Sequence, residues 1–485
     1  MTAPATTALN RPMIIFFIFF LSETSSLNNQ HTTTTGRSEI DTIDCKRTKG
    51  RNAQFSYVRT LAHYDMYVNM AQNGSKAYNS AMNLLTWARK RRFPYEPLIR
   101  VEISKSRLIH NLHEFKKIAP KDIHGNSQIA PVLKSNAYGH GLIEVANTLQ
   151  HEHHIPFFIV DSYFEAIALR AKGFKPHILI IGYTRPETIR DSNLSNISFT
   201  VTSMETLRAI AIQILRLRPK LVHIHLKIDT GMHRQGILPE EIDEAINLLE
   251  HDGAGKRPVI LEGITSHLCD VDNDDEAFSE SQIHLWNKIV ERFRHEFKSL
   301  KYVHLSATDG HRMTHDINAN VSRLGIGLYG ISQNPAINKQ LDLLPVLEMK
   351  TIITGIKDLK EGESVGYGNT FKAPMNMKIA TIPVGYFEGI DRRLSHSNTD
   401  ENSISGGSVL VGAKRTTCPI VGRVSMNITS IDVSKIPDIN VGDEVVAISG
   451  VSSDANSIVN IAKKCTTISY EIVVHIPAHL KRVMV

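Results

Sequence analysis

The stretch APVLKSNAYGHGLIEVANTLQ, residues 130–150, brings together the two kinds of element that set the fold. Residues 130–133 form a short apolar run typical of a buried strand, and residues 142–149 carry apolar side chains at the spacing of an amphipathic helix. Between them lie Asn136, Gly139 and Gly141, which are residue types that favour turns. The stretch therefore predicts a strand, a turn and a helix, with Lys134 at the carboxyl end of the strand.

The same pattern recurs along the chain. Apolar runs begin at residues 157 (FFIVD), 177 (HILIIG), 199 (FTVT), 221 (LVHIHLKID) and 261 (LEGITSH), and a helical pattern follows each of them. Strands that alternate with helices at this spacing indicate a parallel sheet, and this number of units favours a TIM-type (β/α)8 barrel, expected over residues 96–340. Catalytic side chains in such barrels lie at the carboxyl ends of the strands, where Lys134, Lys227, His267 and His304 fall.

The pattern changes after about residue 345. Short β-rich runs such as MKTIITGI (349–356) and GDEVVAISG (442–450) are separated by Gly, Pro, Asp and Asn, which predicts a second, mostly antiparallel β domain over residues 341–485. The expected fold is therefore α/β, with a barrel followed by a β domain.

Residues 1–95 read as a poorly ordered extension, because residues 22–80 are polar, rich in Thr, Ser and Asn, and lack sustained periodicity. An apolar run over residues 13–21 follows one positive charge, Arg11. The run is too short for a stable membrane span but long enough for the apolar core of a signal peptide, although no clear cleavage site follows. A cytoplasmic location is expected, and export is the alternative if residues 13–21 act in a signal peptide.

Composition excludes several other classes. The 485 residues are 42% hydrophobic and 21% charged, with a formal net charge of +6, so the chain is expected to be globular and to have no nucleic-acid partner. The basic cluster at residues 89–92 lacks interleaved aromatic residues and reads as a solvated face or a linker. No metal site or disulfide framework is expected from the spacing of the four cysteines, Cys45, Cys269, Cys418 and Cys465.

Lys134 admits two interpretations from its position alone. Its amine could extend to solvent beyond the end of the strand. Alternatively, it could be a neutral nucleophile that forms a Schiff base with an aldehyde, because burial and neighbouring cations can lower a lysine pKa far enough.

Nine motifs favour the second interpretation. In chain order they are VLKSNAYGHG, HLKIDTGMHRQGI, SHLCDVDN, HLSATDG, VSRLGIGLYG, VGYGNTF, IPVGYFEG, GRVSMN and TTISYE. Together they resemble the motifs of the alanine racemases, which are pyridoxal-phosphate enzymes of the barrel fold type. The resemblance extends from about Leu98 to Val485 and implies a homodimer with shared active sites.

The resemblance also implies the catalytic pair. Lys134 would hold pyridoxal 5'-phosphate as a Schiff base, and Tyr367, supplied by the partner subunit, would be the second base. Racemisation removes a hydrogen from one face of the α-carbon and returns a proton to the other, which two opposed bases do most directly. His267 would help to lower the pKa of Tyr367.

The remaining implied roles concern the cofactor and the substrate. Arg323 would face the pyridine nitrogen, where many pyridoxal enzymes have a carboxylate, so the ring would be a weaker electron sink. Lys227 matches a lysine that is often carbamylated in family members, and it would orient Arg234 beside the cofactor oxygen. The implied phosphate donors are Tyr138, Thr308, Tyr470 and the backbone near Gly325 and Ile326, and Met426 and Tyr386 match residues of the substrate pocket.

The expected function is racemisation of L-alanine to D-alanine for cell-wall peptidoglycan. A racemase of broader amino-acid range and, further off, a decarboxylase of the same fold remain alternatives. Three positions depart from the family pattern, with Ser425 and Asn427 where Cys and Asp are usual and Glu388 where Asp is usual. The loss of a carboxylate at Asn427 could alter substrate preference.

Overall fold

The computed structural model describes residues 96–119, 128–214, 221–250, 259–271, 276–298, 300–399 and 406–485. The extension expected over residues 1–95, with its apolar run at 13–21, lies outside the described residues. Glu96 to Val485 form one compact unit. Within the described ranges, no helix combines the length and the apolar character that crossing a membrane requires.

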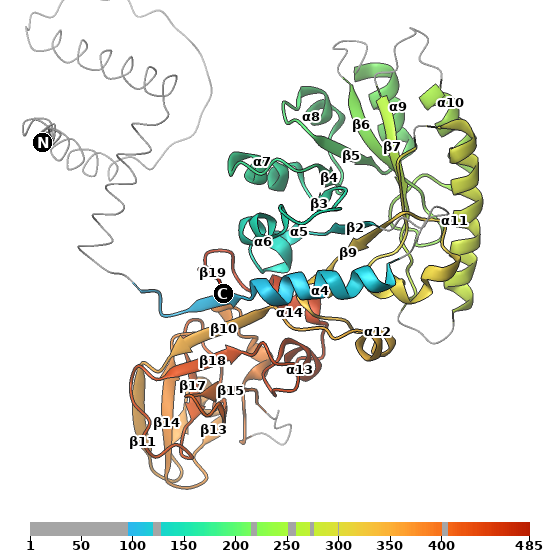
Figure 1. The fold of residues 1–485 in the computed structure, drawn as a ribbon. Coiled ribbons are helices and arrows are strands. Elements are labelled where there is room, and N and C mark those ends of the chain that lie inside the picture. Colours follow the sequence, from blue (N-terminus) through green and yellow to red (C-terminus); the bar gives the residue numbers. More distant parts are fainter. Residues whose placement is uncertain are drawn as a thin grey trace, which may run out of the picture. The chain divides into compact units, whose positions relative to one another are not determined.

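The expected barrel is present, and Figure 1 shows its strands with helices outside them. Strands β3 to β8 form a parallel sheet in chain order, and β2 pairs with β9 in parallel. A bridge between Val132 and Ile159 joins β2 to β3, and Arg323 N donates to Ser306 O at 3.1 Å where β9 follows β8. The barrel strands are β2 (Gln128–Pro131), β3 (Phe158–Val160), β4 (Ile178–Ile180), β5 (Ile197–Val201), β6 (Val222–Lys227), β7 (Val259–Thr265), β8 (Tyr302–His304) and β9 (Val321–Leu324).

The helices follow the strands as the apolar periodicity predicts. Serine caps begin several of them, since the side chains of Ser162 and Ser203 accept from the third residue of α7 and α9. The longer helices turn an apolar stripe inward, as Trp286 and Phe293 of α11 do. The helices are α4 (Lys105–Ile118), α5 (Lys134–Tyr138), α6 (Leu142–Leu149), α7 (Tyr163–Ala171), α8 (Pro186–Asp191), α9 (Met204–Arg208), α10 (Ile242–Glu250), α11 (Ala277–Glu296) and α12 (Pro335–Gln340).

The C-terminal domain is mostly antiparallel, as expected. Its larger sheet has the order β16-β15-β18-β10-β1-β19, and a smaller one has the order β11-β14-β17. Two short helices, α13 (Ile458–Lys464) and α14 (Ser469–Val474), precede the last strand. The strands are β10 (Leu347–Ile352), β11 (Gly355–Leu359), β12 (Ser364–Val365), β13 (Phe371–Lys372), β14 (Met377–Ile382), β15 (Ser408–Val411), β16 (Thr416–Pro419), β17 (Thr429–Asp432), β18 (Glu444–Ile448) and β19 (Arg482–Met484).

The first strand, β1 (Arg100–Ile103), lies in the C-terminal sheet, although the barrel was expected to begin at residue 96. It pairs antiparallel with β10 and parallel with β19, and Figure 1 shows it in blue beside β10. Val101 and Ile103 are buried, whereas Arg100 and Glu102 on the other face bond to charged neighbours. Such alternation suits a sheet with one solvated face, while the barrel strand β3 is buried at every residue.

Candidate active site

Lys134 opens a left-handed turn at the carboxyl end of β2. Ser135, Asn136, Ala137 and Tyr138 have φ between 51° and 55°. A left-handed conformation costs roughly 1–2 kcal/mol for each residue with a Cβ. Strain of this kind persists only where the surrounding structure fixes the backbone. The turn therefore marks a position that the fold holds in place.

Contacts from several elements hold the turn. Leu142 N donates to Asn136 Oδ1 at 2.9 Å, and the His140 ring stacks on Tyr329 at 4.3 Å. Gly139 has φ 78°, and a Cβ there would lie 2.0 Å from the carbonyl oxygen of Val473 in α14. Arg482 of β19 donates to the Gly139 carbonyl at 2.7 Å. The C-terminal domain thus clamps the turn that follows Lys134.

A cradle of donors forms beside this turn. A Cβ on Gly325 would lie 2.9 Å from Tyr138 Oη and 3.6 Å from Thr308 Oγ1, so the glycine leaves open space between these hydroxyls. A 3₁₀ turn begins at Ile326, and the structure gives no acceptor among the described residues for the N–H groups of Gly325 and Ile326. Tyr470 lies beside Tyr138, with ring centroids 6.0 Å apart. The space suits a small anion.

Arg323 on β9 is held by a dense set of acceptors. The side chain is buried, and its terminal nitrogens donate to Thr265 Oγ1, His304 Nδ1 and His267 Nδ1 at 2.7, 2.9 and 3.0 Å. They also donate to three carbonyl oxygens, those of Ser266, His304 and Leu305. The structure gives no acceptor among the described residues for the fifth donor, Nε–H. Arg323 thus has a fixed orientation and one donor left for a ligand.

The electrostatics of this end of the barrel are strongly cationic. Burial, with the positive charges of Arg323 and Arg234, lowers the pKa of Lys227 to about 8. Burial and Arg323 hold the pKa of His267 well below its usual value, so its ring is neutral near pH 7. Burial also lowers the pKa of Arg323 to about 10, which leaves it charged. An anionic ligand would relieve the repulsion among these groups.

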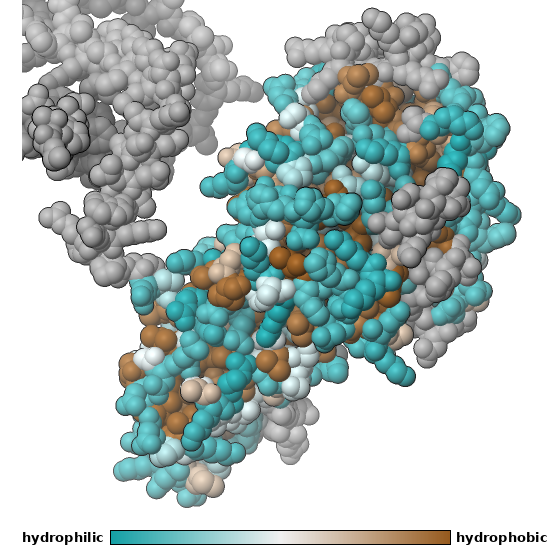
Figure 2. Space-filling view, in the orientation of Figure 1, coloured by the Kyte–Doolittle hydropathy of each residue, from teal (hydrophilic) through white to brown (hydrophobic). Residues whose placement is uncertain are grey.

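Three of the expected site residues lie elsewhere. Tyr367, Tyr386 and Met426 belong to the C-terminal domain and are 71%, 44% and 55% exposed. Among the described residues, no hydrogen bond, ion pair or ring contact joins them to Lys134 or Arg323. Figure 2 shows one face of the molecule, on which apolar patches interrupt the hydrophilic surface over the C-terminal domain.

The loops of Tyr386 and Met426 are locked to one another. Tyr386 N donates to Ser425 O at 3.0 Å, and Phe387 N donates to Met426 O at 2.9 Å. Asn427 Nδ2 donates to Glu388 Oε1 at 2.6 Å, and Glu388 Oε2 accepts from Gly385 N at 2.9 Å. The two loops therefore present their exposed side chains as one rigid set.

Comparison with known proteins places this geometry in a family. Residues 103–333 match the alanine racemase N-terminal domain, and residues 346–484 match the alanine racemase C-terminal domain. This chain belongs to the alanine racemase family. It is therefore an isomerase, and the resemblance inferred from the motifs is confirmed.

The chain aligns with almost the whole length of its relatives in the alanine racemase family. Alanine racemase 2 of Caldanaerobacter subterraneus subsp. tengcongensis is 32% identical over 391 residues, which are 80% of this chain and 94% of the relative. The solved alanine racemase of Clostridium difficile 630 is 29% identical, with a TM-score of 0.70, over 81% of this chain and 96% of that one. The histidine racemase of Leuconostoc mesenteroides subsp. sake is 27% identical, with a TM-score of 0.69, over 80% and 98%.

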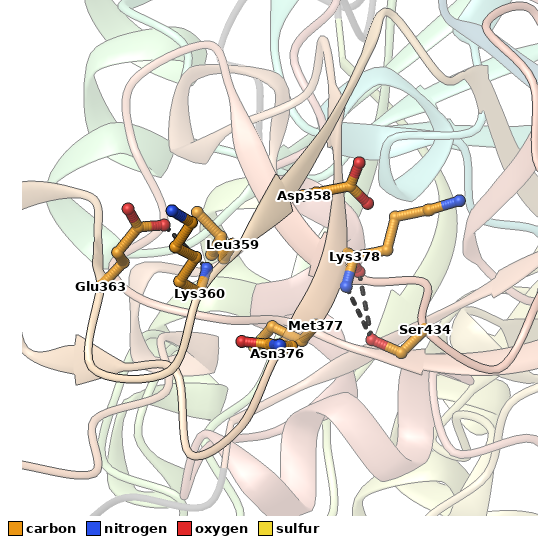
Figure 3. Close-up of a pocket in the computed structure, with 8 residues that line it drawn as sticks. All are labelled: Asp358, Leu359, Lys360, Glu363, Asn376, Met377, Lys378 and Ser434. Carbon is orange, nitrogen blue, oxygen red and sulfur yellow. Dashed lines mark hydrogen bonds between the residues drawn. The ribbon is translucent and has the colours of Figure 1, made fainter.

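A hollow lies in the C-terminal domain, away from the expected site residues. It has a volume of about 550 Å³ and runs along β11 and β14 of the C-terminal domain. Figure 3 shows Ser434 joined to the backbone of Lys378, and Lys360 N donates to Glu363 Oε2 at 2.8 Å. These bonds fix the loops around the strands. The lining residues are Asp358, Leu359, Lys360, Glu363, Asn376, Met377, Lys378 and Ser434.

The motifs did not indicate every residue of the site. The left-handed turn at 135–138 and the bonds of Arg323 to Thr265 and His304 were not expected, although His304 was placed at the carboxyl end of its strand. Asn136, Gly139 and Gly141 signalled a turn but not its hand. The carbonyl acceptors of Arg323 depend on the backbone alone and have no signature in residue type.

Proposed function

We propose that this chain is a pyridoxal-phosphate-dependent alanine racemase that interconverts L- and D-alanine. The observation that carries the proposal is the arrangement at one end of the barrel, where Lys134 and Arg323 flank an anion cradle. β2 and β9 pair there, with Ala130 opposite Arg323 and Pro131 opposite Leu324. The two side chains therefore arise from neighbouring strand ends.

The residues present fit pyridoxal phosphate. Tyr138 Oη, Thr308 Oγ1 and the N–H groups of Gly325 and Ile326 would hold its phosphate, with Tyr470 beside Tyr138, and Lys134 would hold its aldehyde. Arg323 Nε–H would donate to its ring nitrogen. When bound, pyridoxal phosphate withdraws electrons from the substrate's α-carbon and makes its hydrogen acidic.

Two bases would then handle the proton. Lys134 would act on one face of the α-carbon, and Tyr367 of the partner subunit on the other. His267 accepts from Arg323 at Nδ1, so as a neutral ring it carries its proton on Nε2. That N–H is a donor that can stabilise the tyrosine in its basic form, which is the role proposed for His267.

The exposure of the C-terminal set supports a homodimer with shared active sites. Tyr367, Tyr386 and Met426 are suited to contact a substrate but lie on the surface of their own chain. Large exposed apolar side chains are typical of an interface, and the loops of Tyr386 and Met426 are also bonded to one another. In the proposed dimer each chain inserts this set over the barrel end of its partner.

Lys227 has a proposed role in orienting Arg234. A neutral lysine amine can react with carbon dioxide, and a pKa of about 8 leaves about a tenth of the amine neutral at pH 7. The carbamate would carry a negative charge, replacing repulsion between Lys227 and Arg234 with attraction. Arg234, which is exposed, would then be held beside the cofactor oxygen.

The proposed role in the cell is to supply D-alanine for peptidoglycan from the cytoplasm. A broader substrate range is the second candidate, because Asn427 and Ser425 depart from the usual family pattern beside Met426, and one similar solved structure is a histidine racemase. A decarboxylase of the same fold is the less favoured alternative.

The test is to incubate the holoenzyme with L-alanine and follow both D-alanine and carbon dioxide. We expect an approach to equal amounts of the two enantiomers without gas release. Carbon dioxide release, or no D-alanine, would contradict the proposal. A parallel series with L-histidine and L-serine distinguishes an enzyme specific for alanine from one with a broader substrate range. The broader enzyme would give a higher kcat/KM with one of these two amino acids than with alanine.

A further inference from the structure

His225 of β6 is a buried titratable residue that the proposed mechanism does not use. Its side chain is 0% exposed, and its Nδ1 lies 2.8 Å from Nε2 of His304, which is equally buried. His304 in turn lies 2.9 Å from Arg323 through Nδ1. The three side chains form a line from the barrel interior to the site.

The direction of each hydrogen bond along this line follows from Arg323. A guanidinium only donates, so His304 Nδ1 must accept and carries no proton. Burial lowers the pKa of both histidines well below the usual value, so both are neutral near pH 7. The single ring proton of His304 is therefore on Nε2, and it is donated to Nδ1 of His225.

The barrel sheet has room for the His225 side chain. The register of β6 on β7 shifts between Ile224 and His225. Opposite His225 stands Gly263, where a Cβ would lie 2.8 Å from Nδ1 of the imidazole. The Phe157 ring packs edge-on to His225 with centroids 5.3 Å apart. A glycine and a register shift at one point indicate that the sheet makes room for this side chain.

We propose that His225 is a positioning residue for the racemisation: by accepting from His304, it fixes the ring tautomer that lets His304 accept from Arg323. This inference rests on the proposed contact between Arg323 and the ring nitrogen. Without His225, His304 Nε2–H would have no acceptor. Transfer of the His304 proton to Nδ1 would then place its N–H opposite an N–H of Arg323. These two donors would repel each other, and the guanidinium of Arg323 would be held less firmly.

The experiment compares three variants of the holoenzyme. His225→Leu removes the acceptor at similar volume, whereas His225→Asn keeps an acceptor near the position of Nδ1. His177→Leu is the matched control, because His177 is another histidine packed on Phe157 but bonds to Ser198 rather than to His304.

Two readouts distinguish positioning from packing. One is the nitrogen-15 chemical shift of isotopically labelled cofactor, which reports protonation of its ring nitrogen. The other is the ratio of transamination to racemisation, where transamination moves the amino group of alanine to the cofactor and releases one pyruvate per site. For H225L we expect a shift toward the protonated ring and a ratio about five-fold higher, with KM for alanine changed by less than about two-fold.

H225N and H177L should match wild type in both readouts. A wild-type shift and ratio in H225L, or equal changes in H225N, would overturn the proposal. If H225L does not fold, His225→Gln replaces it, because the longer side chain moves the amide away from the Nδ1 position. Arg323→Glu is measured alongside: if it too leaves the nitrogen shift unchanged, the contact between Arg323 and the ring nitrogen fails as well.

Discussion

The two groups of site residues differ most in how completely their own chain surrounds them. Arg323 in the barrel is 7% exposed and donates to six acceptors from two neighbouring segments, residues 265–267 and 304–305. Tyr367 in the C-terminal domain is 71% exposed and sits between two glycines, Gly366 and Gly368, with positive φ. The barrel residue is surrounded by its own chain, whereas the tyrosine of the C-terminal domain is largely uncovered.

This difference separates the tasks of the two regions. In the proposed function the barrel end holds and orients the cofactor, because its donors are fixed by contacts within the chain. In the proposed dimer Tyr367, Tyr386 and Met426 act only where the partner subunit covers them. Binding of the cofactor and turnover of the substrate should therefore respond differently to substitutions in the two regions.

The largest expected effect compares Lys134→Ala with Tyr367→Phe. Loss of Lys134 should lower racemase activity by at least about 10³-fold and abolish the visible absorption band of the bound cofactor, because the Lys134 amine is the group proposed to hold the cofactor's aldehyde. Loss of the Tyr367 hydroxyl should lower activity by about 10²–10⁴-fold but leave that band intact. Absorption spectra and chiral assays on both proteins check this. A Tyr367→Phe protein that lacks the band would contradict the proposal that the barrel binds the cofactor without the C-terminal residues.

An intermediate effect concerns stability in acid. Burial lowers the pKa of His140 and His311 in the barrel to about 4. The unfolded chain, with an ordinary histidine pKa near 6.5, then binds more protons between pH 4 and 6.5, so stability is complete above pH 6.5 and falls as the pH drops through this window. At pH 5 the loss is about 2 kcal/mol for each histidine.

Urea unfolding at pH 7 and pH 5 tests this loss. His311→Asn keeps an N–H group for the carbonyl oxygens of Ala307 and Thr308 that His311 contacts, and it should reduce the loss by about 2 kcal/mol. His475→Asn is the control, because His475 of the C-terminal domain has a side chain 63% exposed. An equal change in both variants would contradict the assignment of acid sensitivity to the barrel.

The smallest effect lies in the C-terminal loops. Asn427→Asp places a carboxylate beside Glu388, and repulsion should loosen the two loops and lower kcat/KM for alanine about five-fold, or about 1 kcal/mol. The double variant Glu388→Gln with Asn427→Asp restores an amide–carboxylate pair in the reverse orientation and should return kcat/KM to within about two-fold of wild type. Additive losses in the double variant would mean that this pair does not couple the loops.

Much of the fold could be predicted because it depends on local patterns. Continuous apolar runs such as residues 178–180 are buried on both faces, and they mark barrel strands whatever surrounds them. Strand β1 is different, because its partner β10 lies about 250 residues further along the chain. Its alternating pattern of exposed and buried residues suits a half-solvated strand but does not specify the sheet to which the strand belongs.

The site divides in the same way. Lys134 and Arg323 stand in motifs that the sequence displays directly. The left-handed turn after Lys134 could not be predicted, because Ser135, Ala137 and Tyr138 do not favour that conformation. The contacts of Val473 and Arg482 with Gly139, at the end of the turn, come from the distant C-terminal domain. Exposure of Tyr367 is likewise a property of the folded chain, and only the family resemblance implied that another subunit covers it.

The central claim is that each active site combines Lys134 from one chain with Tyr367 of the partner subunit. Lys134→Ala and Tyr367→Phe proteins, each nearly inactive alone, are unfolded and refolded together in equal amounts, and native mass spectrometry verifies the mixed dimers. Random pairing gives mixed dimers in about half the population, each with one intact site, so activity should recover to about a quarter of wild type per subunit. A mixture with mixed dimers present but no more activity than its parents would contradict the shared active site.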